Sequence, residues 1–276
     1  MLEIPEALTV ARQLKETLLG KTITKAVAAA SPHGFAFYFG DPAIYGDLLE
    51  GKKITGTAAY GGRPEIEADD MRLSFGEGVN MRYADDAAKA PAKHQLWIEF
   101  DDGSIIFCTI QMYGFIGAFP EGGNDDYYYM VGKEKPSPLT DKFDFEYFSG
   151  LLTDETRKIS AKAFLATEQR IPGLGNGVLQ DILWYAKIHP KRKMATLSDG
   201  EFKNLFDTVK TVLAQMTEKG GRDTEKDIFG NPGGFETVMS KKNDGMPCPV
   251  CGDTIRRFSY LGGNVYVCEG CQGTGK

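Results

Sequence analysis

The spacing of apolar and polar residues changes twice along the chain. Between residues 5 and 19 apolar side chains recur every three or four positions and Gly20 follows, which predicts an amphipathic helix. Residues 21–120 contain short stretches rich in Val, Ile, Phe and Tyr, among them 34–39, 71–75 and 96–100, separated by Gly, Pro and Asp. This pattern predicts a β-rich sandwich or barrel, in which Asp101-Asp102-Gly103 closes one hairpin.

Helical spacing returns in the second half of the chain. Four segments separated by Gly or Pro predict a small helical bundle, at residues 143–152, 153–169, 176–187 and 198–218. Residues 121–138 combine Gly, Pro, acidic residues and three tyrosines, a composition typical of a connector. We therefore expect an α+β protein with an N-terminal helix and β-sandwich domain at residues 1–125, a helical domain at 140–220 and a small C-terminal finger at 243–276.

The bulk composition is that of a folded globular protein. The chain has 276 residues, enough for two domains, with 42% hydrophobic and 25% charged residues. It contains no run of 18 apolar residues, and its first residues carry regular charges, so neither a membrane span nor a secretory signal is predicted. We expect a monomer that stays in the cytoplasm, associated with the nucleoid if the source is bacterial.

The charge distribution permits a nucleic-acid partner although the formal net charge is −6. Lys and Arg supply most of the nonspecific affinity for DNA, so an acidic chain argues mildly against such a partner. Residues 187–193 and the pair Arg256-Arg257 are nevertheless basic islands, and a local patch can bind a polyanion. A solvated basic loop is the alternative interpretation.

Four of the five cysteines form two pairs near the C-terminus. Cys248 and Cys251 are followed, after sixteen intervening residues, by Cys268 and Cys271, which is the spacing of a four-cysteine zinc ribbon. Disulfides are not expected in a chain without an export signal, and a redox site needs only one such pair. We predict one structural Zn²⁺, because four thiolates leave no coordination position open for water.

The metal would order a hairpin at residues 255–266, with its turn at 261–264. Arg256 and Arg257 lie on this hairpin and direct it toward a polyanion.

Five segments resemble, in the same order, the formamidopyrimidine-DNA glycosylases and their relatives of the endonuclease VIII type. They are residues 3–6 followed by a helix, Lys93-His94 with 101–103, Lys162 before 173–176, residues 188–190, and 218–221 leading through Asp227 and 233–235 to the cysteines. The resemblance covers nearly the whole chain. It implies an N-terminal helix plus β-sandwich, a helix-two-turn-helix domain and a zinc finger, with double-stranded DNA in the cleft between the domains.

The resemblance also implies which residues contact DNA. Lys162 and Asn176 would hold phosphates around the lesion, Asn176 beside backbone N–H groups at the start of a helix, where an anion can approach closely. A simple helix-capping turn is the alternative for residues 173–176. Gln111, Met112 and Tyr113 correspond to the wedge that fills the void left by an extruded base, in a form closer to the Gln-Leu-Tyr of endonuclease VIII.

The zinc finger of the family grips a phosphate through an arginine near the turn of its hairpin. Here Gly263 and Asn264 occupy that place. We therefore expect a weaker phosphate contact from Asn264, together with those of Arg256 and Arg257.

The residues expected to perform the chemistry are only partly present. In the family a proline at the second position attacks the sugar C1′, but here that residue is Leu2, whose primary amine could form a Schiff base only after removal of Met1. Glu3 corresponds to the acid/base partner, and Glu6 is also present. Gly62 stands where the family has a hairpin lysine. Both glutamates could instead serve only to stabilise the helix start.

Two interpretations follow from this pattern. The first is a DNA glycosylase of base excision repair that removes a damaged base by an altered mechanism, without the proline-dependent lyase reaction. The second is a catalytically inactive protein that binds damaged or abasic DNA. The retained Glu3 and Glu6 favour the first, and the missing proline, lysine and arginine favour the second.

Overall fold

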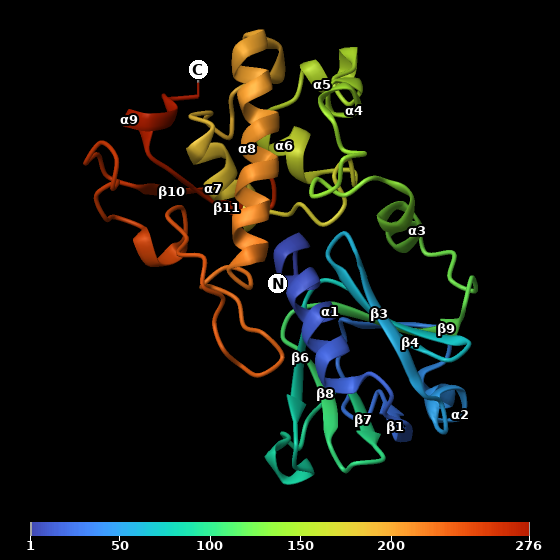
Figure 1. Ribbon diagram of the computed structural model, residues 1–276. Helices are drawn as coiled ribbons and strands as arrows, with labels where there is room; N and C mark the ends of the chain where they lie inside the picture. The colour runs from blue at the N-terminus through green and yellow to red at the C-terminus, as the bar shows by residue number, and fades with distance from the viewer. Residues whose placement is uncertain (1, 276) are drawn as a thin grey trace.

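The computed structural model describes residues 2–275 (Figure 1). Its first helix, α1 (Ile4–Leu18), begins and ends one residue earlier than the spacing predicted. Glu3 is the N-cap residue and forms a capping box with Glu6, and Pro5 lies in the first turn, where its missing N–H costs no hydrogen bond. The start of the helix lies between the β-sandwich and the helical part of the molecule (Figure 1).

Two sheets form the β-sandwich. One has the strand order β1 (Ile23–Ala28), β7 (Leu96–Phe100), β8 (Ile105–Ile110), β6 (Val79–Ala84). The other has the order β2 (Ala36–Phe39), β9 (Gly114–Pro120), β5 (Met71–Phe75), β4 (Arg63–Ala68), β3 (Ile54–Tyr60), in which only β2 and β9 are parallel. Short helices η1 (Pro42–Ile44), α2 (Tyr45–Leu49) and η2 (Ala87–Lys89) lie between strands.

Strand β7 illustrates why these sequences form a sandwich. Leu96, Ile98 and Phe100 are buried, while Trp97 and Glu99 between them are half-buried, as expected for one face on a core. The predicted Asp101-Asp102-Gly103 turn joins β7 to β8, and its glycine has φ +81°, which an L side chain rarely adopts. The hairpin prediction is confirmed.

The helical part contains more breaks than predicted. It comprises α4 (Phe145–Gly150), α5 (Asp154–Arg157), α6 (Ala161–Ala166), α7 (Val178–Tyr185), η3 (Met194–Thr196) and α8 (Asp199–Glu218). The single helix predicted for residues 153–169 is wrong, because Ser160 accepts from Ala163 N and starts a new helix. The first N–H groups of α6 donate to the carbonyls of Arg192 and Pro190, contacts that local spacing does not reveal.

The connector predicted at residues 121–138 also contains a helix, α3 (Tyr127–Glu134). Asp126 caps it by accepting from Tyr129 N, and Tyr129 and Val131 are buried. A helix of only two turns with two buried side chains leaves little periodicity to detect in a tyrosine-rich segment.

The C-terminal finger consists of η4 (Lys241–Asn243), the hairpin β10 (Arg256–Tyr260) and β11 (Gly263–Val267), and α9 (Glu269–Gln272). Its turn is shorter than predicted, because only Leu261 and Gly262 lie between the strands. Both have positive φ, +48° and +73°, the backbone form of a tight two-residue hairpin. Asn264 is therefore a strand residue paired with Ser259, and its assignment to the turn is wrong.

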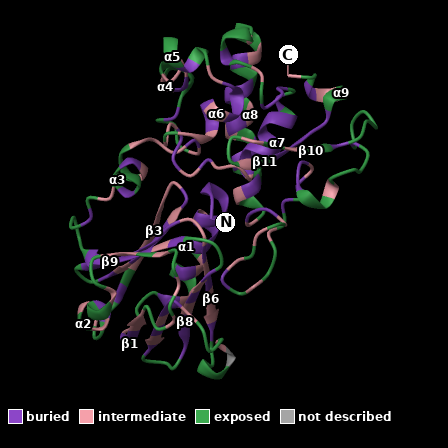
Figure 2. Ribbon diagram, turned by 180° about the vertical axis from the view of Figure 1, so that it is seen from behind, coloured by how far each residue is buried: buried purple, intermediate pink, exposed green. Residues whose placement is uncertain are grey.

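Two large apolar cores result, and α1 contributes to both. Val10, Leu14 and Leu18 of α1 belong to the core of the sandwich, whereas Ile4 belongs to the core of the helical part. Viewed from behind, buried residues gather along α1 and where α6, α7 and α8 meet (Figure 2). The predicted α+β class, with helix plus sandwich, helical domain and four-cysteine finger, is confirmed. In the described part of the chain, every helix is too short or too polar to cross a membrane.

Candidate functional site

The backbone before α1 is held between two glycine turns. The N–H of Ile4 donates to the carbonyl of Gly173 at 3.0 Å. A β-carbon placed on Gly62, in the turn between β3 and β4, would lie 3.0 Å from the Leu2 carbonyl oxygen, and one on Gly173 would lie 2.2 Å from Gly62 N. The two turns can approach this closely only because Gly62 and Gly173 have no side chain. Their approach fixes the backbone of Leu2, whose own side chain is buried in the sandwich core.

Glu3 closes the start of helix α7. Its carboxylate accepts from Gly177 N at 2.8 Å and from Val178 N at 2.7 Å, and only 2% of the residue is exposed. These are N–H groups of the turn at which a DNA phosphate was expected. A carboxylate of the chain itself occupies this end of the helix, where partial positive charge stabilises an anion.

Glu6 pairs with Arg222, a residue that the sequence analysis did not single out. Arg222 donates from Nε to Glu6 Oε1 at 3.0 Å and from Nη2 to Glu6 Oε2 at 2.9 Å, and its backbone N–H also donates to Oε1 at 3.0 Å. Arg222 Nη2 lies 3.7 Å from Glu3 Oε2. Two carboxyls and one guanidinium are thus buried together.

The two carboxyls differ in their affinity for a proton. Burial raises the pKa of Glu3, because it outweighs the more distant charge of Arg222 and the two backbone donors. Burial acts on Glu6 in the same direction, but the charge and hydrogen bonds of Arg222 prevail and lower the pKa of Glu6. Two neighbouring acids whose environments separate their pKa values are suited to acid/base chemistry.

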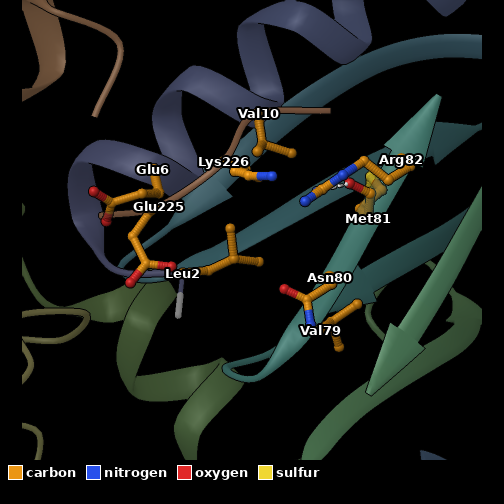
Figure 3. A pocket seen from close by; sticks show the side chains of 9 residues that line it. All are labelled: Leu2, Glu6, Val10, Val79, Asn80, Met81, Arg82, Glu225 and Lys226. Atoms are coloured by element: carbon orange, nitrogen blue, oxygen red, sulfur yellow. Dashed lines mark hydrogen bonds between the residues drawn. The ribbon is translucent and has the colours of Figure 1, made fainter. Parts of the chain in front are cut away.

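A narrow pocket opens beside these residues (Figure 3). It is lined by Leu2, Glu6, Val10, Val79, Asn80, Met81, Arg82, Glu225 and Lys226. The pocket is small, because the centre of a water molecule fits within only about 20 Å³ of it. In Figure 3 the side chain of Leu2 points from the α1 side toward the residues of β6.

The predicted wedge forms an exposed turn between β8 and β9. Gln111, Met112 and Tyr113 all lie in it, and Met112 is 73% exposed. Tyr113 Oη donates to Glu77 Oε2 at 3.5 Å, and burial raises the pKa of Glu77. An exposed apolar tip of this kind is available to contact a large partner.

The residues predicted to hold phosphate meet at the finger. Lys162 Nζ donates to the carbonyl of Tyr260 at 2.6 Å, and Asn176 Nδ2 donates to that of Asn264 at 3.0 Å. Burial lowers the pKa of Lys162. Gln180 also binds the Asn264 carbonyl, through Nε2 at 3.0 Å. Lys162 and Asn176, the two residues predicted to bind phosphate, therefore attach the finger hairpin to the helical part.

The two arginines of the finger remain exposed on strand β10. Arg257 lies 3.3 Å from Asp244 through Nε, and Arg256 precedes it in the same strand. Neither residue contributes to the cluster around Glu3.

The four cysteines of the finger form a candidate metal centre. The sulfur atoms of Cys248, Cys251, Cys268 and Cys271 all lie within 4.8 Å of one another. Three of their separations are 3.2, 3.5 and 3.8 Å. Thiolates arranged tetrahedrally at about 2.3 Å from an ion would be about 3.8 Å apart, so shifts of a few tenths of an ångström would let these four sulfur atoms hold one metal ion.

Arg222, Glu225 and Glu77 were missed by sequence reasoning. Glu3 and Arg222 are more than 200 positions apart, so no local spacing connects them. The only available signal was a charged residue directly after Gly220-Gly221, a backbone turn in which both glycines have positive φ.

Comparisons with known proteins agree with the organisation described above. The model of the "Formamidopyrimidine-DNA glycosylase H2TH domain" matches residues 135–227. The formamidopyrimidine-DNA glycosylase of Erythrobacter litoralis is 29% identical over 99% of this chain and 100% of its own length, and that of Lactococcus lactis subsp. cremoris is 28% identical over 99% of both.

Solved structures show the same likeness. The complex between Lactococcus lactis Fpg and DNA containing an abasic site has a TM-score of 0.83 and 25% identity, covering 98% of this chain and 99% of that one. The Fpg protein of Thermus thermophilus shares the fold, with a TM-score of 0.81, 24% identity and 98% coverage of both chains.

Proposed function

Because the chain belongs to the family of formamidopyrimidine-DNA glycosylases and endonuclease VIII, we propose that it is a base excision repair glycosylase. It binds damaged or abasic double-stranded DNA and releases a damaged base with Glu3 as the acid/base group. The observation that carries this proposal is the carboxyl of Glu3, buried at the start of α1 with a raised pKa, directly after Leu2, which lines a pocket.

Glu3 has the properties of a group that moves a proton. Its raised pKa favours the protonated form, which can donate to the leaving base or to the sugar ring oxygen as the glycosidic bond breaks. The resulting carboxylate is held by the N–H groups of Gly177 and Val178 and can take a proton back from the attacking water or amine. The same two bonds keep its orientation fixed throughout.

The pocket beside Leu2 and Glu6 is the proposed site of the extruded base. An enzyme that reacts at a base in a duplex must first rotate it out of the stack. The pocket is too narrow for a base as it stands, so Glu225 and Lys226 must move outward when a base enters.

The DNA duplex would follow the finger and the start of α7. Lys162, Asn176 and Asn264 lie together there, with Arg256 and Arg257 on the same hairpin. Gln111, Met112 and Tyr113 extend from the sandwich and would fill the gap in the stack. The similar Lactococcus lactis Fpg was solved in complex with DNA containing an abasic site, which supports this class of partner.

We assign the four cysteines to one structural Zn²⁺, which has no open position at which to activate water. The ion would stabilise the hairpin that carries the arginines. We further propose a monomer with domains near residues 1–125, 140–220 and 243–276, acting in the cytoplasm or on the nucleoid.

Base release from a panel of lesion-bearing duplexes tests the function. We expect the wild-type protein to release at least one damaged base, and Glu3→Gln to abolish release while DNA binding remains. Glu146→Gln is the matched control, because Glu146 is exposed on α4, outside the cluster around Glu3. Borohydride should trap little covalent complex with abasic DNA, since Leu2 replaces the family's proline.

Three results would decide against this proposal. Full activity of Glu3→Gln would exclude the acid/base role. Binding without release from any lesion would favour the inactive damage-binding protein, for which the burial of the Leu2 side chain and the missing lysine at Gly62 already argue. Absence of binding to every damaged duplex would contradict both functions.

A further inference from the structure

One guanidinium serves two buried carboxyls at the start of α1. Glu3, Glu6 and Arg222 are 2%, 5% and 3% exposed. Glu6 accepts hydrogen bonds from two side-chain nitrogens of Arg222 and from its backbone N–H. Glu3 lies farther from that guanidinium, at 3.7 Å, and experiences mainly its field.

We infer that Arg222 is a positioning residue for Glu3. Glu6 holds the guanidinium of Arg222 at a distance from Glu3 at which the Glu3 carboxyl can both keep and release a proton. Because this role rests on the proposed function of Glu3, its primary test measures Glu3 without DNA.

The backbone around the cluster is shaped for this arrangement. A β-carbon on Gly177 would lie 1.6 Å from Arg222 Nη1 and 2.9 Å from Glu3 Oε1, and one on Gly175 would lie 2.7 Å from Glu3 Oε1. Gly177 has φ −76°, which any residue adopts, so its glycine is explained by space and not by conformation. The turn before α7 thus admits the guanidinium and the carboxyl together.

The local charges explain why the two carboxyls differ in proton affinity. If both carboxyls were ionised, Arg222 would neutralise only one of them in an environment where an unpaired charge is costly. The other titratable groups near the cluster are Glu225, 4.0 Å from Arg222 Nη2, Asp181 on α7 and Tyr113 on the turn after β8. The nearby cations besides Arg222 are Lys226, which lines the pocket with Glu6, and the amino group of the chain, which lowers the pKa of Glu6. Of the two carboxyls, Glu3 therefore has the higher proton affinity, because it lies farther from Arg222 and burial raises its pKa.

The segment that carries Arg222 also connects the cluster to the pocket. Glu225 and Lys226 follow Arg222 within four residues and line the pocket beside Leu2. The segment is attached to both domains, since Ile228 is buried in the sandwich core and Phe235 in the helical core. A base that moves Glu225 and Lys226 therefore acts on the segment that fixes Arg222, which couples base entry to the proton affinity of Glu3.

Carboxyl-carbon NMR titration of Glu3 tests this inference directly in the whole protein. An opposite charge at this range lowers a carboxyl pKa by roughly 1 to 3. In Glu6→Gln, which removes a like charge and leaves Arg222, we expect the pKa of Glu3 to fall by about 1 or more. In Arg222→Gln we expect the titration of the coupled pair to move upward by a similar amount, and Arg222→Lys should restore part of the difference.

Arg192→Gln is the matched control, because Arg192 forms an ion pair with Glu201 on α8 and should leave Glu3 unchanged. If Arg222→Gln does not fold, Glu6→Gln and Arg222→Lys suffice. If the pKa of Glu3 changes by less than about 0.3 in Glu6→Gln and also in the Arg222 variant that folds, the inference is overturned, even if the stability of the variants falls. Failure of DNA binding by the wild-type protein would instead reject the proposed function and leave the titration result standing.

Discussion

Single residues around Glu3 show how glycine and charge cooperate to build the site. Gly62, Gly173, Gly175 and Gly177 bring backbone within reach of Leu2 and Glu3, where a β-carbon on any of them would be crowded. The sequence identified the glycine turn and Glu3 separately and assigned the turn to a DNA phosphate. It could not reveal that Glu3 takes two of the N–H groups, because the contact joins residues more than 170 positions apart.

Substitution of Gly177 tests the crowding. Gly177→Ala should destabilise the protein by about 1 to 3 kcal/mol, the usual cost of overpacking, because Arg222 is held by Glu6 and cannot move aside freely. Urea unfolding measures the difference. Gly200→Ala on α8 is the control, since a β-carbon there meets nothing within 4 Å and should be neutral or slightly stabilising. Equal stabilities of the two variants would contradict the packing described for Gly177.

The raised pKa of Asp181 predicts that the free energy of unfolding depends on pH. Burial raises its pKa to about 6 from an ordinary 3.8, although Val238 N and Met239 N donate to it. Its stabilising contribution is therefore complete below about pH 3.8 and is lost as pH rises through about 6, by about 3 kcal/mol at 1.4 kcal/mol per pKa unit.

Asp181→Asn keeps an oxygen acceptor and removes the charge. Unfolding measured at pH 4 and pH 7 should show a smaller loss of stability in this variant than in the wild-type protein, by about that amount. Asp141→Asn, at an exposed position, should behave like the wild type. Identical losses in all three proteins would mean that Asp181 ionises without cost.

At the level of elements, spacing identified most of the regular structure but not its interruptions. Strands β5 and β7 coincide with the predicted stretches. Helix α1 differs from its prediction by one residue at both ends, and α8 by one residue at its start. The break between α5 and α6 was missed because carbonyls of residues 190 and 192 stabilise it from outside the segment. The cysteine pattern predicted the finger, whereas its attachment through Lys162 and Asn176 required the fold.

Removal of the metal should release the finger hairpin from Lys162 and Asn176 of the helical part. In Cys251→Ser, or after chelation, we expect loss of one bound Zn²⁺ per chain and loss of amide protection in residues 247–272, with protection of β7 and α8 retained. Metal analysis and hydrogen exchange measure both. Cys108→Ala is the control, because Cys108 is buried in the sandwich core and its variant should keep the metal. An ordered hairpin in the metal-free protein would exclude a structural ion.

At the level of the whole molecule, the cluster around Arg222 joins the sandwich and helical cores. The predicted domains left residues 221–242 unassigned, yet this segment contributes to both cores and supplies Arg222. Segments between predicted domains carry no periodic signal, so their role depends on long-range contacts. The net charge of −6 likewise gave no indication of where DNA would bind.

Salt dependence tests the proposed placement of DNA. If Arg256 and Arg257 each neutralise one phosphate, the double Arg→Ala variant should reduce the slope of log affinity against log salt by roughly 2. Arg12→Ala, on the exposed face of α1, should leave the slope unchanged. Titrations of one duplex between low and moderate salt provide the comparison, and an unaltered slope in the double variant would place the DNA elsewhere.

Recognition of damage in duplex DNA underlies every proposed role of these residues, and equilibrium binding to two duplexes that differ at one position is its sharpest test. At low ionic strength, we predict at least tenfold tighter binding to a duplex with a stable abasic analogue than to the same duplex without damage. Equal affinities for the two duplexes would contradict damage recognition by this protein.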